Sequence, residues 1–143
     1  MAEIVVFDTN IRLAAHLWRG AAYRCWLAAR VGFVELVYSR EMVAEFSEKL
    51  YDKFGFSADN VRAAVYDFRR YGREVSIKGD LHVVAKDPDD DMFVQCAVIA
   101  GASMIVSGDL HLLDLGEYQG IKILSPGDFL DWLATLGPPS PAD

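Results

Sequence analysis

Four acidic residues of this chain lie in sequence contexts that could bring their carboxylates into one pocket: Asp8, Glu45, Asp91 and Asp109. Asp8 ends the apolar run 4–7, and Asp109 follows the apolar run 104–106 after a Ser-Gly pair. Both acids are therefore predicted at the carboxyl ends of buried strands, the edge of an open α/β sheet where ligands bind. Neighbouring carboxylates repel each other by about 4 kcal/mol per pair at about 4 Å and an effective dielectric of about 20. Because a bound cation such as Mg²⁺ relieves that cost, the pattern favours a divalent-metal site.

Three of these acids also have a structural interpretation that the sequence leaves open. Asp8, the first residue of an Asp-Thr-Asn triplet, could simply cap the helix that follows. Glu45 belongs to a series of acids at helical spacing, which periodicity alone makes a solvated face. Asp109 follows Gly108, and Gly-Asp is common in turns.

The acidic cluster 87–91 is mostly explained by helix capping and by the helix macrodipole, which favours acids in the first turn. Asp91 is the exception, because it lies past the cap and directly before the apolar stretch 92–94. A carboxylate there could point back over the sheet edge. The three histidines do not form a ligand spacing, although His111 lies two residues after Asp109.

Length and composition indicate one compact domain, since the 143 residues are 52% hydrophobic and can bury a core. The net charge of −7 argues against broad nucleic-acid binding, but the charges are segregated. Residues 1–78 carry 12 Lys and Arg against 10 acids, and residues 79–143 carry 2 against 11. An acidic half beside a mildly basic half suits a metal pocket flanked by a surface that tolerates phosphates, although the charges alone favour ordinary surface variation.

The two cysteines, Cys25 and Cys96, have no CxxC spacing, so neither a thiolate metal site nor a disulfide framework is indicated. The N-terminus lacks the regions of a signal peptide, and no apolar run is long enough to span a membrane. We therefore expect a cytoplasmic protein without membrane association.

Short apolar runs alternate with segments of helical period, which predicts βαβ units in a layered α/β fold. The predicted strands are 4–7, 33–38, a weak one at 75–77, 104–106 and 121–124. The predicted helices are 10–18, 21–31, 40–53, 58–71, 88–100 and 126–136. Residues 1–136 are expected to form the single domain, and the Pro-rich tail 137–143 is expected to be disordered.

The helix predicted at 58–71 places basic side chains on a face opposite its apolar stripe. Arg62 and Arg69, with Arg73 just beyond, could attract a nucleic-acid backbone. An amphipathic helix needs a charged face in any case. The chain contains no Gly-rich phosphate loop, no GxSxG motif and no Cys/His ligand set, which argues against nucleotide kinases, α/β hydrolases and zinc enzymes.

Four motifs, in this order and spacing, resemble the PIN-domain ribonucleases over residues 4–132, and most closely the branch of toxins from toxin–antitoxin pairs. They are Phe7-Asp8-Thr9-Asn10, Tyr38-Ser39-Arg40-Glu41 leading to Glu45, Asp87-Pro88-Asp89-Asp90-Asp91-Met92-Phe93, and Ile105-Val106-Ser107-Gly108-Asp109-Leu110-His111-Leu112-Leu113. The resemblance implies a three-layer α/β/α fold with a central parallel sheet of about five strands.

The resemblance also implies which residues form the site. The family's acids fall on Asp8, Glu45, Asp91 and Asp109, as catalytic residues and metal ligands, with Asp90 replacing Asp91 if the local register shifts by one residue. The accompanying polar positions, which would contact substrate or orient ligands, fall on Thr9, Asn10 and Ser107. Arg12 departs from the family pattern, because that stretch is usually apolar. It could pair with Glu3 or contact substrate.

The function implied is hydrolysis of RNA by a water that one or two Mg²⁺ or Mn²⁺ ions activate. As a toxin, the protein would have an antitoxin partner, and a homodimer is plausible. Two alternatives stay open. One is a non-catalytic scaffold that acts by binding a partner, in which the acids serve as helix caps. The other is a nuclease that acts in RNA processing or on DNA.

Overall fold

The computed structural model describes residues 2–78 and 90–137. The strands are β1 (Glu3–Phe7), β2 (Val34–Tyr38), β3 (Gly72–Glu74), β4 (Met104–Val106), β5 (Glu117–Tyr118) and β6 (Ile121–Leu124). The helices are α1 (Thr9–Leu17), α2 (Ala21–Arg30), α3 (Arg40–Asp52), α4 (Ala58–Arg70), α5 (Asp91–Ala100), α6 (Leu110–Leu115) and α7 (Pro126–Ala134).

The strands form one sheet in the order β3-β2-β1-β4-β6-β5. Five of them run parallel, and the short β5 pairs antiparallel with β6 as the first strand of a hairpin. The predicted parallel sheet is confirmed, and the hairpin adds a sixth strand to it. Because β1 and β4 are central neighbours, the residues that follow them meet at one edge.

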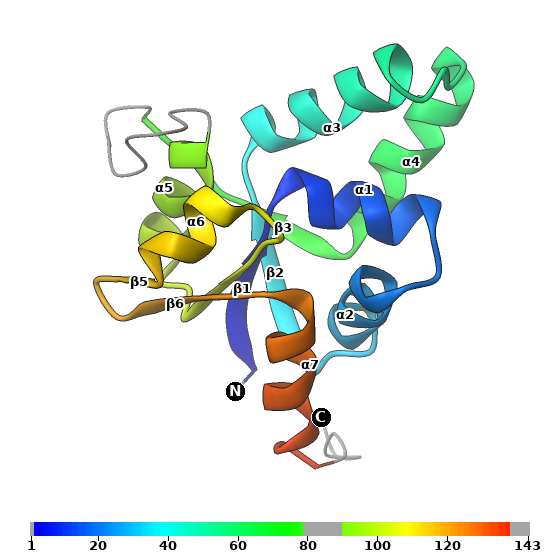
Figure 1. The fold of residues 1–143 in the computed structure, drawn as a ribbon. Helices are drawn as coiled ribbons and strands as arrows, with labels where there is room; N and C mark the ends of the chain where they lie inside the picture. Colours follow the sequence, from blue (N-terminus) through cyan, green and yellow to red (C-terminus); the bar gives the residue numbers. More distant parts are fainter. Residues whose placement is uncertain (1, 79–89, 138–143) are drawn as a thin grey trace.

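Helices cover both faces of the sheet, which makes three layers (Figure 1). Val5 and Phe7 of β1 pack into a core with α1, α2 and α7, whereas Val6 packs into the core on the opposite face with α3, α4, α5 and α6. Successive strand residues point to opposite faces. A strand buried on both sides is therefore a continuous apolar run, which is why β1 and β4 could be found from the sequence.

Side-chain caps define the starts of several helices. The hydroxyls of Ser57 and Ser125 accept hydrogen bonds from the backbone N–H of Asn60 and Asp128, so α4 and α7 begin at their predicted positions. The helices of the described residues have 6 to 13 residues, and none of them combines the length and apolar character needed to cross a bilayer.

The edge strand predicted at 75–77 is wrong in position, because β3 is Gly72–Glu74. Its residues are polar because it pairs on one side only, with β2, and it therefore gives no apolar signal. Val75 still donates its N–H to the carbonyl oxygen of Tyr38, at 2.8 Å, but lies just past the strand. The short α6 and β5 were not predicted at all.

Two predictions fall wholly or partly outside the described residues. The helix start predicted at residue 88 lies within 79–89, and the described helix α5 begins at Asp91. The predicted tail lies outside them as well, except for Gly137.

Gly72→Ala should destabilise the fold, because a Cβ at Gly72 would lie 2.8 Å from Cδ1 of the buried Tyr38 ring. We expect a loss of about 1–3 kcal/mol in the free energy of unfolding, as for other overpacked sites. Chemical denaturation would measure it. Gly127→Ala in the first turn of α7 is the control, since the nearest atom to its Cβ is Oγ of Ser125 at 4.0 Å, and it should be neutral or stabilising. Equal stability of the two variants would contradict the prediction.

Candidate functional site

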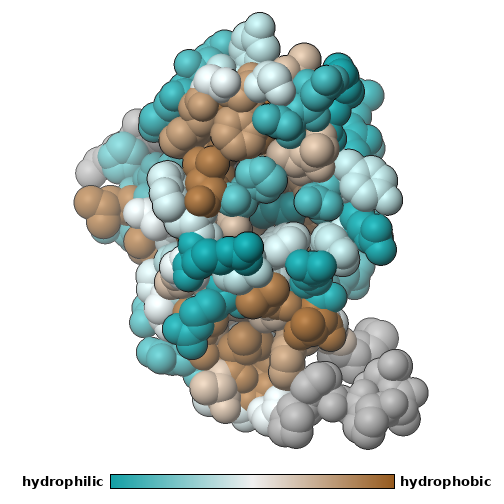
Figure 2. Space-filling model, turned by 90° about the vertical axis from the view of Figure 1, so that its right-hand side faces the viewer, coloured by the Kyte–Doolittle hydropathy of each residue, from teal (hydrophilic) through white to brown (hydrophobic). Residues whose placement is uncertain are grey.

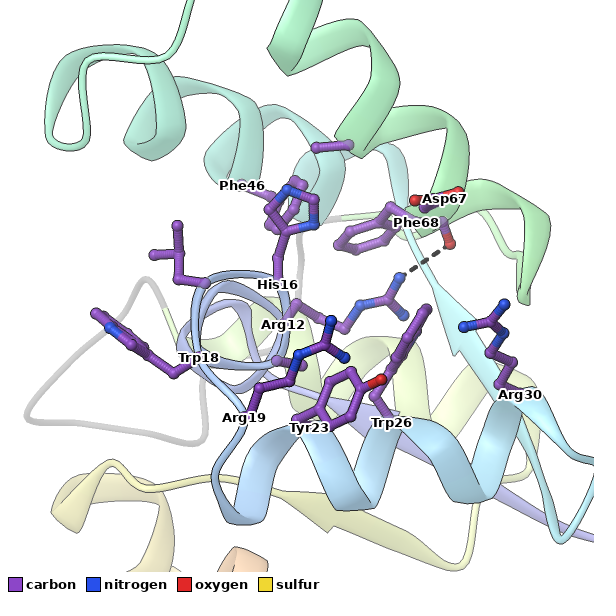
Figure 3. Close-up of a pocket in the computed structure, with 13 residues that line it drawn as sticks. Arg12, His16, Trp18, Arg19, Tyr23, Trp26, Arg30, Phe46, Asp67 and Phe68 are labelled. Atoms are coloured by element: carbon purple, nitrogen blue, oxygen red, sulfur yellow. Dashed lines mark hydrogen bonds between the residues drawn. The ribbon is translucent and has the colours of Figure 1, made fainter.

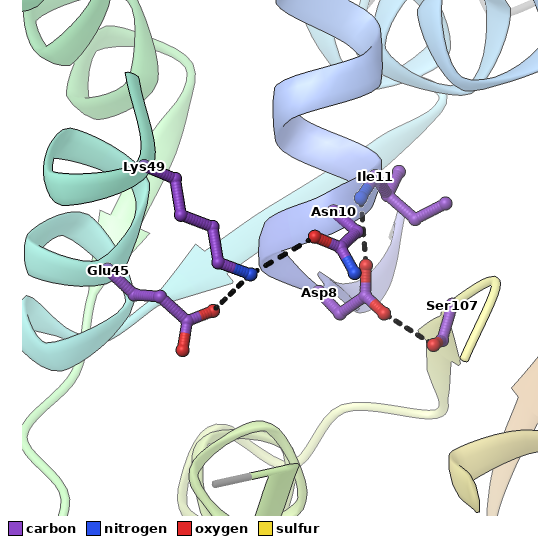
Figure 4. Close-up of polar contacts among 6 residues, drawn as sticks. All are labelled: Asp8, Asn10, Ile11, Glu45, Lys49 and Ser107. Atoms are coloured by element: carbon purple, nitrogen blue, oxygen red, sulfur yellow. Dashed lines mark hydrogen bonds and ion pairs between the residues drawn. The ribbon is translucent and has the colours of Figure 1, made fainter. Parts of the chain in front are cut away.

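Asp8 lies between the end of β1 and the start of α1 and is 2% exposed. Its Oδ1 accepts a hydrogen bond from the N–H of Ile11 at 2.8 Å, so it caps α1. Its Oδ2 accepts a hydrogen bond from Oγ of Ser107 (Figure 4). The Asp8 N–H donates to the carbonyl oxygen of Val106 at 3.1 Å. Two hydrogen bonds therefore hold the carboxylate, and a third holds the Asp8 backbone at the end of β4.

Ser107 directly follows β4 and is fully buried. Its Oγ donates to Asp8 and accepts a hydrogen bond from the N–H of Asp109 at 2.9 Å. Asp109 in turn caps α6, because its Oδ1 accepts from the N–H of His111 at 2.7 Å. One hydroxyl thus connects the two acids that the sequence places at strand ends.

Helix α3 supplies Glu45 and Lys49 on the other side of the site. Nζ of Lys49 lies 3.8 Å from Oε1 of Glu45 and donates to Oδ1 of Asn10 at 3.3 Å, which joins α3 to the first turn of α1 (Figure 4). The side chains of Lys49 and Glu45 are 37% and 28% exposed, so the ion pair contributes little stability. Its importance is that it brings one positive charge to a group of carboxylates.

At the start of α5, the structure places Asp90 rather than Asp91 on the wall of this site. Both residues are buried, but only Asp90 lines the same pocket as Asp8. Asp90, Asp109 and His111 can each offer one ligand atom, and these atoms lie within 4.8 Å of one another. Asp90 in place of Asp91 is the alternative, shifted by one residue, that the sequence left open.

The resulting pocket has a volume of about 180 Å³. It is lined by Asp8, Thr9, Asn10, Glu45, Lys49, Asp90, Phe93 and Asp109. Carboxylate, hydroxyl and amide oxygens are the ligands of hard cations such as Mg²⁺ and Mn²⁺, so the donor set fits such an ion. Oγ1 of Thr9 is buried and has no hydrogen-bond partner within the described part of the chain. A buried polar atom without a partner costs free energy, which a ligand in the pocket would recover.

Burial raises the pKa of Asp8 from 3.8 to about 6. The hydrogen bonds from Ser107 and from the N–H of Ile11 oppose this rise, whereas the charges of Asp109 and Glu45 add to it. The carboxylate is therefore costly to ionise until a cation reaches the pocket.

Most of the residues predicted for the site are brought together here, and two lie off the pocket wall. Asp91 is the first residue of α5, and Ser107 is buried behind Asp8. Sequence reasoning missed Lys49 and Phe93. Lys49 could have been found from its position four residues after Glu45, but Phe93 lies in an apolar stretch that gives no such signal.

The structure thus combines a layered, mostly parallel sheet with an acidic pocket at the carboxyl edge of its strands. A family model described as the PIN domain matches residues 4–111, and the chain therefore belongs to the PIN-domain family, whose members are generally nucleases. No curated protein matches the sequence.

Two solved structures share the fold. PAE2754 from Pyrobaculum aerophilum superimposes with a TM-score of 0.62 at 17% identity, over 94% of this chain and 90% of that one. A chain in the crystal structure of VapBC2 from Rickettsia felis, bound to a DNA fragment from their promoter, gives a TM-score of 0.61 at 12% identity. That match covers 85% of this chain and 98% of the other.

Asp8→Asn should stabilise the metal-free protein at about pH 8 and have little effect near pH 4. The folded state binds the Asp8 proton more tightly than the unfolded state, so ionisation above pH 6 costs up to about 3 kcal/mol, a cost that Asn avoids while it keeps the cap. Thermal melts across this pH range would measure the difference. The exposed Asp52→Asn is the control and should show no such pH dependence. A lower melting temperature for Asp8→Asn at pH 8 would contradict the prediction.

Lys49→Met should tighten Mn²⁺ binding several-fold, because the Lys49 ammonium group lines the pocket and repels a metal ion bound there. The melting temperature of the metal-free protein should fall slightly, since Lys49 offsets the repulsion between carboxylates. Calorimetric titration with Mn²⁺ would measure the affinity. Lys53→Met, one turn further along and exposed, is the matched control. Identical Mn²⁺ affinities of the two variants would contradict the prediction, because they would show that the Lys49 charge does not affect metal binding.

Proposed function

We propose that this PIN domain is a metal-dependent endoribonuclease and the toxin component of a toxin–antitoxin pair. The observation that carries the proposal is the convergence of four carboxylates on one pocket at the carboxyl edge of the sheet: Asp8, Glu45, Asp90 and Asp109. Four neighbouring acids are costly without a cation, and the donor set suits Mg²⁺ or Mn²⁺.

In this proposal Asp8, Asp109 and Glu45 hold the metal together with Asp90 or Asp91. A bound Mg²⁺ or Mn²⁺ lowers the pKa of a water molecule and stabilises charge on the scissile phosphate. Ser107 keeps the Asp8 carboxylate in place through its hydrogen bond.

The polar residues of the pocket have supporting roles in the same proposal. Thr9 and Asn10 lie at the pocket wall, where they can contact substrate or ligand water. Lys49 provides a positive charge for the phosphate beside Glu45.

The toxin assignment is a separate step from the nuclease assignment. It is supported by the fold shared with a chain of VapBC2 from Rickettsia felis and by the order of the four acidic motifs. The toxin assignment also implies an antitoxin partner, a homodimer and a cytoplasmic site of action. In the same proposal residues 1–136 form a single PIN-like domain.

One observation favours a second candidate, a scaffold that binds a partner without catalysis. Asp8 and Asp109 each cap a helix, and capping alone would explain why acids stand at these positions. Capping does not explain Glu45, which lies inside α3 and lines the same pocket.

RNA cleavage with Mg²⁺, with Mn²⁺ and with EDTA is the test. Wild-type protein should cut single-stranded or structured RNA only with metal and leave 5′-phosphate and 3′-hydroxyl ends. Asp8→Asn and Asp109→Asn should lower the rate by at least about 100-fold, because loss of a metal ligand removes several kcal/mol of transition-state stabilisation. Asp90→Asn beside Asp91→Asn decides which acid acts, and Asp52→Asn is the inert control.

Two outcomes would count against RNA hydrolysis by a metal-activated water. Ends with 2′,3′-cyclic phosphate would show that the RNA 2′-OH, not water, is the nucleophile. No cutting under any condition, with no rise in melting temperature on addition of metal, would favour the scaffold, since binding to the folded state alone must stabilise it. Preferential cutting of DNA would support the assignment of the active site but would identify DNA as the substrate.

A further inference from the structure

A second and larger pocket lies between α1, α2, α3 and α4. Its volume is about 390 Å³, within the usual range for small-ligand sites. Figure 3 shows the guanidinium of Arg12 pointing into this space, with the rings of Tyr23 and Trp26 on α2 below it and Phe68 on α4 above it. We call this the Arg12 pocket.

Arg12 is a buried cation with no acidic partner among the residues that the structure describes. The residue is 6% exposed, one Nη donates to the carbonyl oxygen of Phe68 at 3.0 Å, and the guanidinium carbon lies 3.7 Å from the centre of the Phe68 ring. Pairing with Glu3, one of the two options from the sequence, is wrong, because these two described residues form no ion pair and the Glu3 carboxylate instead accepts a hydrogen bond from Ser103. Within the described chain no carboxylate forms an ion pair with Arg12.

An unpaired buried charge is costly, and a guanidinium has five N–H donors. Burial lowers the pKa of Arg12 to about 9, so the group still carries its charge at neutral pH. Only one of the donors is used by a protein carbonyl in the described structure. Donors that face a cavity and lack an acid are suited to an anionic ligand.

Two more arginines surround the same cavity. The guanidinium of Arg19 lies 4.3 Å from the ring centre of Tyr23, and that of Arg30 lies 5.3 Å from the ring centre of Trp26. Neither has an acidic partner among the residues described here. Asp67 is the single acid of the lining, so the pocket is positive although the chain carries a net charge of −7.

The arginines at 62, 69 and 73, which could also attract a nucleic-acid backbone, have acidic partners. Arg62 pairs with Asp59, Arg69 with Glu74 and Arg73 with Glu35. Their charges are already balanced by neighbouring acids. Figure 2 shows the face that bears α1, α2 and α4, where hydrophilic side chains form a band between hydrophobic patches above and below it.

Unpaired arginines beside aromatic rings match the chemistry of a nucleotide. Bases stack on aromatic rings and on guanidinium planes, and phosphates accept hydrogen bonds from Arg in a forked geometry. The position also fits, because α1 carries Asp8 at its start and Arg12 four residues later, about 6 Å along the helix axis. An RNA chain bound in the acidic pocket can therefore place a neighbouring nucleotide in the Arg12 pocket.

We propose that the Arg12 pocket binds one unpaired nucleotide of the RNA next to the cleaved bond. Its base lies against Tyr23 and Trp26, and its phosphate is held by Arg12 and Arg19 with Arg30 at the rim. This inference rests on the proposed ribonuclease function. The pocket acts as a specificity site that selects unpaired RNA, because a base within a duplex is not free to stack there.

The test measures binding in EDTA, where no metal-dependent cleavage interferes. The probes are a fluorescein-labelled oligouridylate and an abasic oligomer of the same length and charge. The oligouridylate should bind about tenfold more tightly, since stacking on aromatic rings requires bases. The Arg19→Gln/Arg30→Gln double variant should lose about tenfold in affinity for it. Arg24→Gln is the matched control, because Arg24 lies on the same helix as Arg30 but outside the pocket lining.

Arg12→Met removes the buried charge at similar volume and should weaken binding as well. If this variant does not fold, the exposed rim positions Arg19 and Arg30 still decide the question. Equal affinity for the two oligomers, or unchanged affinity in the double variant, would overturn the proposal. An acidic peptide that binds the pocket while the oligouridylate does not would also overturn it.

The two proposals fail separately. If oligouridylate binds in an arginine-dependent manner but none of the single-stranded and structured RNAs is cut with any metal, the nuclease assignment fails and the assignment of a nucleotide ligand to the pocket stands. If RNA is cut by the double variant with wild-type kcat and KM, the pocket assignment fails and the nuclease stands. In the expected case, the double variant cuts with a raised KM.

Discussion

The parallel pairing of β1 with β4 aligns Phe7 with Val106, and this register places Asp8 beside Ser107 where both strands end. A shift of one residue would turn the side chains of β1 to the opposite faces of the sheet. The hydrogen bond from the Asp8 N–H to Val106 continues the ladder one residue beyond the strands. Both helix starts at this edge, and the acids that cap them, therefore depend on the sheet core.

Helix α1 organises two sites of opposite charge. Its first turn faces a pocket of carboxylates, and its second turn faces the arginine-lined pocket. Helix α3 borders both pockets, because Glu45 lines one and Phe46 lines the other. The net charge of −7 conceals this division. Adjacent regions of opposite potential would orient a polyanion, since its phosphates favour the arginines unless a cation occupies the acidic pocket.

The sequence predicted what depends on local patterns. The buried strands were visible as apolar runs, and Asp8 and Asp109 could be placed from their positions after those runs. Glu45 could not be separated from a solvated helical face by periodicity, and only the family resemblance singled it out. The choice between Asp90 and Asp91 depends on where α5 begins, and capping signals do not fix that boundary to one residue. The Arg12 pocket could not be predicted from the sequence, because its lining comes from four helices, α1, α2, α3 and α4, whose contacts join residues distant in sequence.

Asp8 is both a candidate metal ligand and a structural residue, and this limits how the chain can evolve. Its carboxylate caps α1 and joins Ser107 to the end of β1. Loss of a helix cap costs about 1 kcal/mol, a large share of the stability of a small domain. A descendant that abandoned catalysis would therefore tend to retain Asp, Asn or Ser at this position. Conservation of an acid at position 8 would therefore reflect its contribution to folding stability as well as a role in metal binding.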